Sequence, residues 1–133
     1  MEDLIICSPL RVVRSKTKFF ILNLNHYRNA HYHTLNKAKS EYLLAVEEQI
    51  KNLPTYEQVR LSYTLYPENR MKCDLDNVLA IHAKFFQDVL VTLGRIPEDN
   101  YKHVLSSCQY FGEVDKTNPR VEIKIERVLW TLF

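Results

Sequence analysis

The segment CDLDNVLAIHAKFFQDVLVTLG, residues 73–94, decides the fold that this chain can adopt. Its apolar residues recur with helical spacing, which predicts a helix of about four to five turns over residues 77–93. Gly94 stands where a glycine commonly follows a helix, at the C′ position. Two aspartates, Asp74 and Asp76, lie two positions apart just before this helix, and a further acidic pair follows its end.

Strand patterns flank the helix on both sides. Residues 57–67, EQVRLSYTLYP, alternate apolar and polar side chains, as a strand with one buried face does. Residues 101–111 and 120–130 are predicted to be two further strands, joined by a hydrophilic turn. The N-terminal part predicts two strand segments and then one helical segment that Pro54 ends: residues 3–13, 18–24 and 25–53. The order ββ-α-β-α-ββ predicts an α+β fold, a single domain over residues 1–133 with a mixed β-sheet covered by two main helices.

Composition excludes several classes of protein. With 133 residues, 46% of them apolar and 26% charged, the chain is typical of one globular domain. Only two glycines are present, so no glycine-rich phosphate loop can form. Three cysteines without a C-x-x-C spacing argue against a disulfide framework or a zinc ribbon and favour a reducing compartment. No signal peptide and no apolar run near the ~20 residues of a membrane span is visible, so we expect a cytoplasmic protein that does not engage a membrane.

Charge is distributed unevenly along the chain. The net charge is only +2, yet residues 4–40 contain no acidic residue and seven lysines and arginines. A basic region beside an acidic group favours a polyanionic partner such as nucleic acid. The alternative is an ordinary solvated surface, which a modest excess of charge also allows.

The acidic residues around the helix permit two interpretations. Asp74 and Asp76, placed two apart on an extended segment, would point to the same side and could converge on one Mg²⁺ ion, which prefers carboxylate and phosphate oxygens. Asp99, in the turn after the helix, could supply a third carboxylate if the chain turns back. The alternatives are that an aspartate of the first pair only caps the helix, and that Glu98 and Asp99 are solvated turn residues.

One lysine shares a helix face with the acidic pair. Lys84 follows Asp76 by eight residues, close to two helical turns, so both side chains emerge on the same side of the helix. A cation there could contact a phosphate or hold a carboxylate in place. Asp88, four residues further on, could instead form a surface ion pair with Lys84.

These motifs together resemble the RusA family of Holliday-junction resolvases. The resemblance rests on DLDN, on the K-F-F-x-D-x-L block in the following helix, and on G-x-x-x-x-D-N after it; the segment LNLNHYRNAHYH also resembles the stretch before that family's first helix. It covers residues 18–128, and the acidic block is its most specific part. Two features depart from the family pattern. The helix between DLDN and the lysine is one turn longer, and the arginine run before DLDN is reduced to NRMKC.

The resemblance implies a dimeric, Mg²⁺-dependent endonuclease that cuts four-way DNA junctions by paired incisions, with Mn²⁺ as a possible substitute for Mg²⁺. It implies that Asp74, Asp76 and Asp99 are catalytic metal ligands and that Lys84 is the catalytic lysine. It also implies DNA recombination and repair in the cytoplasm of a bacterial or phage-infected cell. The residues expected to contact DNA are Arg14, Lys16, Lys18, Arg28, Lys37, Lys39, Arg70 and Lys72.

Two other functions stay open on the sequence alone. The chain could bind junctions or other branched DNA without catalysis, with a purely structural acidic group. It could also be a nuclease of the same chemistry that acts on flaps or replication forks.

Overall fold

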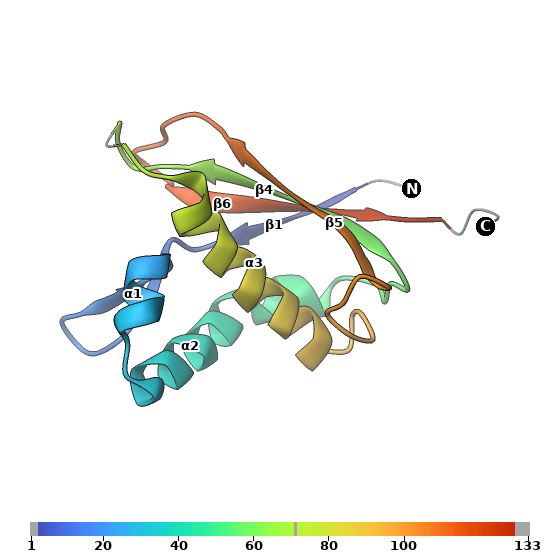
Figure 1. Ribbon diagram of the computed structural model, residues 1–133, viewed down its shortest axis with the longest axis horizontal. Coiled ribbons are helices and arrows are strands. Elements are labelled where there is room, and N and C mark those ends of the chain that lie inside the picture. Colours follow the sequence, from blue (N-terminus) through green and yellow to red (C-terminus); the bar gives the residue numbers. More distant parts are fainter. Residues whose placement is uncertain (1–2, 71, 130–133) are drawn as a thin grey trace.

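A computed structural model describes residues 3–70 and 72–129 (Figure 1). The described residues form one α+β domain, which confirms the predicted fold class. The elements are, in chain order, β1 (Leu4–Ser8), β2 (Arg11–Val13), β3 (Phe19–Ile21), α1 (Leu24–Asn29), α2 (Tyr32–Lys51), β4 (Val59–Tyr66), α3 (Leu75–Thr92), β5 (Val104–Phe111) and β6 (Arg120–Arg127). The predicted last strand extended to Trp130, which lies outside the described residues.

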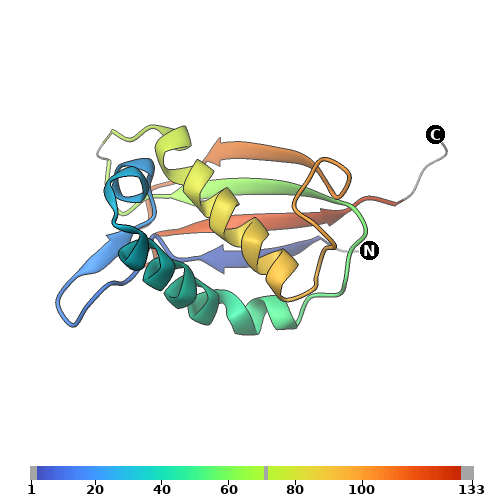
Figure 2. The same ribbon diagram turned by 60° about the horizontal axis from the view of Figure 1, so that its bottom comes forward.

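The main sheet has four strands in the order β1-β6-β4-β5. β4 and β5 run parallel and are connected through α3, whereas β6 is antiparallel to both β4 and β1. The sheet is therefore mixed, as the sequence predicts. Strands β2 and β3 pair only with each other, as a separate antiparallel hairpin. Figure 2 shows α3 crossing the sheet diagonally, with α2 beside it on the same face.

The order of elements differs from the prediction at two places. The first predicted strand is divided into β1 and β2 at Pro9, which lacks the N–H needed to continue a ladder. The first predicted helix is divided into α1 and α2, because Ala30 and His31 have extended backbone angles. The imidazole of His31 then accepts the N–H of His33 and caps α2.

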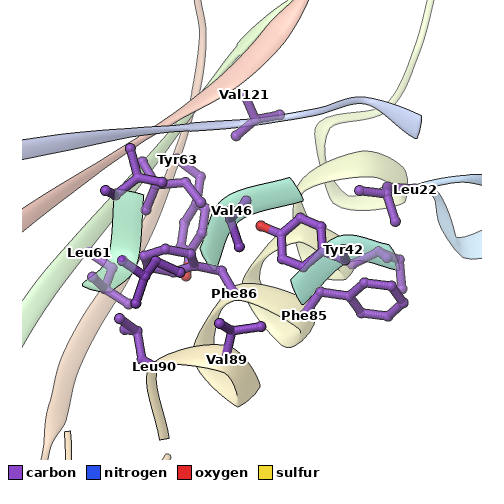
Figure 3. Packing of buried hydrophobic residues seen from close by; sticks show 14 of the residues in the cluster. Leu22, Tyr42, Val46, Leu61, Tyr63, Phe85, Phe86, Val89, Leu90 and Val121 are labelled. Atoms are coloured by element: carbon purple, nitrogen blue, oxygen red, sulfur yellow. The ribbon is translucent and has the colours of Figure 1, made fainter. Parts of the chain in front are cut away.

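The core lies between the sheet and the two long helices (Figure 3). Alternate residues of β4 and β6 are buried, as their sequence patterns predict. From α3, Phe86 packs edge-on against Tyr63 of β4, while Phe85 packs against Tyr42 of α2. Helices cover only this face of the sheet, so the opposite face is open to solvent (Figure 1).

Gly94 ends α3 as the sequence predicts. Its φ of 69° lies in the left-handed region, which glycine adopts without a steric penalty. The Gly94 N–H bonds the carbonyl of Val91, so the chain turns sharply after the helix. Within the described residues, none of the helices has the length and apolar character needed to cross a membrane.

Candidate functional site

The two aspartates of DLDN lie at the N-terminal end of α3. Asp74 is the N-cap residue, and its carboxylate accepts the N–H of Asp76 at 3.2 Å. Asp76 belongs to the first helical turn and not to an extended segment, because α3 begins at Leu75, two residues earlier than predicted. Both carboxylates are exposed. Asp74 thus caps α3 through one carboxylate oxygen, while the alternative that it has no other role stays untested.

This pair suits a hard divalent cation. Mg²⁺ typically takes one or two carboxylates together with water and substrate phosphate, and an exposed pair leaves room for both. The unpaired N–H groups and the dipole of the N-terminus of α3 also favour anions at this place, both the carboxylates and an incoming phosphate. The residues present therefore fit Mg²⁺ or Mn²⁺, while the metal assignment itself stays a prediction.

A side-chain amide joins this end of α3 to the basic N-terminal segment. The Oδ1 atom of Asn77 accepts the N–H of Leu24 at 3.2 Å, across 53 positions of sequence. Asn23, which precedes Leu24, caps α1 by accepting the N–H of His26. The asparagines of LNLN and DLDN therefore have a structural role. They hold α1 against the first turn of α3, next to the aspartate pair.

Lys84 lies further along α3, beside Tyr27 of α1. Its Nζ atom is 5.7 Å from the centroid of the Tyr27 ring, a cation–π contact, and the side chain is exposed. Lys84 also interacts electrostatically with Asp99. The structure therefore brings Lys84 to Tyr27 and Asp99, about 12 Å along the helix axis from the turn that carries Asp76.

Asp99 does not join the pair at the start of α3. It lies beside Asp88; partial burial and the Asp88 charge raise its pKa, and Lys84 opposes that shift. Asp88 follows Asp76 by twelve residues, or about 18 Å of helix rise. Within residues 3–70 and 72–129, no group of three or more histidines, cysteines and acids could hold a metal. The length of α3 thus separates the three predicted ligands into a pair and a single carboxylate.

A groove of ≈ 540 Å³ runs between α2 and α3 beside Asp99. Its floor includes the apolar side chains of Phe85 and Val89, and Asp88 and Asp99 stand at its rim. Lys39 also lines this groove, so it stands apart from the other basic residues predicted to contact DNA. Sequence reasoning missed the groove because nothing in the spacing of α2 indicates which residues face α3.

The other basic residues gather near α1 and the start of α2. Arg14, Lys18 and Lys37 line one hollow of ≈ 430 Å³. Figure 1 and Figure 2 place α1, the β2–β3 hairpin and the first turns of α2 and α3 at the same end of the molecule. The remaining predicted DNA contacts at this end are exposed residues of the hairpin turn, of α1 and of the loop before α3: Lys16, Arg28, Arg70 and Lys72. One end therefore carries both the aspartate pair and seven of the eight basic residues predicted to contact DNA.

A buried polar cluster ties three elements together behind this end. The hydroxyl of Ser8 lies 2.6 Å from the hydroxyl of Tyr42 and 2.7 Å from Nδ1 of His82. All three residues are fully buried, and Nε2 of His82 has no hydrogen-bond partner among the described residues. Burial lowers the pKa of His82 to about 3, so its ring is neutral at neutral pH. The sequence showed His82 only as a residue packed within the helix.

Comparison with protein-family models and with curated proteins finds no match to this chain.

Proposed function

We propose that this protein is a metal-dependent, structure-selective endonuclease that cuts branched DNA, with four-way junctions as its principal substrate. The hydrogen bond between Asn77 and Leu24 is the observation that carries the proposal. It joins the acid-free segment, at the start of α1, to the first turn of α3, so the basic residues and a site that suits a divalent cation lie at the same end of the molecule. A purely structural N-cap requires no basic surface beside it.

The residues divide into two roles. Asp74 and Asp76 would hold Mg²⁺ or Mn²⁺, and the ion would supply Lewis-acid activation of the phosphodiester and of the attacking water. Arg14, Lys18 and Lys37 would hold the DNA backbone through non-specific phosphate contacts. No side chain is needed as a nucleophile in this chemistry.

Lys84 and Asp99 form the second part of the proposed site. Lys84, exposed beside Tyr27, would contact a phosphate next to the one that is cut. Asp99 interacts with Lys84 and would orient its ammonium group. In this proposal Asp99 acts through Lys84. For Asp99 to be the third metal ligand, either the chain after α3 would have to rearrange or a second copy would have to supply its Asp99.

The resemblance to the RusA resolvases supports the same proposal and adds three points. The active form would be a homodimer, since paired incisions need two sites related by a two-fold axis. The process would be DNA recombination and repair, and the compartment would be the cytoplasm of a bacterial or phage-infected cell.

A second candidate is a branched-DNA-binding protein without catalysis. The observation that favours it is the capping contact from Asp74 to the N–H of Asp76, which gives Asp74 a structural role. A third candidate, a flap or fork nuclease, uses the same residues on a different DNA.

The test uses four labelled DNAs of matched sequence: a four-way junction, a fork, a flap and a linear duplex. Each is incubated with the protein in Mg²⁺, in Mn²⁺ and in EDTA. The proposal predicts paired nicks in the junction with either metal and none in EDTA. Preferred cutting of the fork or flap would favour the third candidate. Junction binding without any cutting would support the second candidate and overturn the enzyme proposal.

A further inference from the structure

The two outer edges of the four-stranded sheet differ in whether their outward backbone groups have hydrogen-bond partners. At the β1 edge, the side-chain amide of Gln49 donates to the Cys7 carbonyl at 3.0 Å and accepts the Cys7 N–H at 2.8 Å. Helix α2 thus satisfies the outward backbone groups of that edge at Cys7. At the β5 edge, no hydrogen bond from the described residues reaches the outward groups of residues 107–111. An open edge of this length is a template for another strand.

The hydrogen bonds to β4 show which backbone groups of β5 are free. The Gly112 N–H bonds the carbonyl of Leu65 in β4. Since the backbone groups of successive residues point to opposite edges of a strand, even-numbered residues of β5 face β4. Ser107, Gln109 and Phe111 therefore point their N–H and C=O groups outward.

The residues of β5 lack the features that normally protect an edge. Its sequence, VLSSCQYF, contains no charged residue and no proline. Tyr110 and Phe111, at its end, are each 53% exposed. The side chains near the middle are small or neutral, and the amide of Gln109 is both donor and acceptor, so it can pair with an identical amide.

We propose that β5 pairs antiparallel with β5 of a second copy of this chain, about a two-fold axis through Gln109. This register pairs Ser107 with Phe111 of the other copy and Gln109 with itself, so all three outward residues are bonded. It also sets Cys108 opposite the Tyr110 ring of the second copy. A second copy fits better than a foreign strand because every pair in this register is uncharged and antiparallel self-pairing satisfies both edges at once.

The pairing has a consequence for DNA that rests on the proposed function. A two-fold axis normal to the joined eight-stranded sheet leaves the helices of both copies on the same side of it. Both aspartate pairs then lie on one face of the dimer, toward opposite ends of the paired strands. Two such sites could address the two opposed strands of one junction.

Cross-linking tests the register directly. In a background of Cys7→Ser, Cys73→Ser and Cys108→Ser, Gln109→Cys places two thiols across the axis, where the Cα spacing of about 5.5 Å allows a disulfide. Ser106→Cys in the same background is the control, because its thiols would stand about 20 Å apart. The proposal predicts at least about tenfold more covalent dimer from Gln109→Cys under mild oxidation. Equal cross-linking of both variants would overturn it.

Solution mass provides the second measurement. Gln109→Lys sets two like charges opposite each other and should give a monomer by light scattering, with an unchanged circular dichroism spectrum, whereas Ser106→Lys should remain a dimer. A monomeric parent protein at micromolar concentration would also overturn the proposal. The nuclease assay separates the two claims. Dimers that cut no DNA would contradict only the proposed function. A monomer that cuts junctions would contradict this inference and the homodimer of the proposed function, but not metal-dependent cleavage.

Discussion

Asn77 accepts the backbone N–H of Leu24 through its side-chain oxygen at 3.2 Å, and this contact joins the start of α3 to the start of α1. The donor is partly buried, so removing the acceptor leaves it without a partner. We expect Asn77→Ala to lower the free energy of unfolding by about 1 kcal/mol, measured by urea denaturation. The same variant should weaken junction binding, because α1 loses its anchor beside the aspartate pair.

The matched control for that variant is Asn29→Ala. The Asn29 amide donates to the exposed carbonyl of Asn25, one turn earlier. This substitution should change stability by less than about 0.5 kcal/mol. If both variants behave alike, the link between Asn77 and Leu24 has no special role.

The burial of His82 predicts that the folded protein loses stability in acid. Its pKa is lowered to about 3 in the folded state by burial, from an ordinary value of 6.5. Between these values the unfolded chain binds more protons, so stability rises with pH and is lost as pH falls from about 6.5 toward 3. We expect the free energy of unfolding to fall by roughly 2 to 3 kcal/mol between pH 7 and pH 4.5 because of this histidine.

Thermal unfolding at several pH values measures that contribution. His82→Leu should flatten the loss below pH 6.5 relative to the parent protein, even if it lowers stability at pH 7. His33→Gln, at an exposed position, should retain the parent slope. An unchanged slope in His82→Leu would show that His82 does not remain neutral in the folded protein.

Substitution of either glycine should lower stability, for a different physical reason at each position. At Gly112, an added Cβ would meet the Tyr66 ring at 2.8 Å and the Leu65 carbonyl at 3.1 Å, so Gly112→Ala should cost roughly 1 to 3 kcal/mol. At Gly94 there is space, but the φ of 69° strains an alanine by about 1 to 2 kcal/mol. Gly94→Asn should cost less than Gly94→Ala, because asparagine tolerates left-handed angles. Chemical denaturation compares all three.

Lys37 and Lys39 are predicted to differ in their effect on DNA binding. Lys37 lines the basic hollow with Arg14 and Lys18, whereas Lys39 lines the groove beside Asp88 and Asp99. Lys37→Ala should weaken binding to all DNAs and reduce the salt slope of log K by about 1. Lys39→Ala should leave that slope nearly unchanged. Equal losses would place Lys39 in the DNA-binding surface, as the sequence alone predicted.

The strands and helices with one buried face could be predicted, because burial of one face makes apolar residues recur at a regular spacing. Val59, Leu61, Tyr63 and Leu65 alternate along β4, and all are buried. Gly94 was equally informative, since few residues other than glycine adopt its backbone angles. The break between α1 and α2 could not be predicted, because Ala30 and His31 are neither glycine nor proline.

The candidate site was predictable only in part, for a similar reason. Asp74 and Asp76 are neighbours in sequence, so their proximity follows from the chain. The position of Asp99 depends on how the turn after α3 folds, and this turn places Asp99 beside Asp88. The cluster of Ser8, Tyr42 and His82 depends on the packing of three elements, which no local pattern encodes.

The most direct measurement is junction cleavage in Mg²⁺ by Asp76→Asn and by Asp88→Asn. Both substitutions remove one exposed carboxylate from α3, so they match in charge and helix context. We expect Asp76→Asn to lose cleavage by at least about a hundredfold while it still binds the junction. We expect Asp88→Asn to keep cleavage within severalfold of the parent. Equal cleavage by the parent and Asp76→Asn would contradict a metal site at the start of α3.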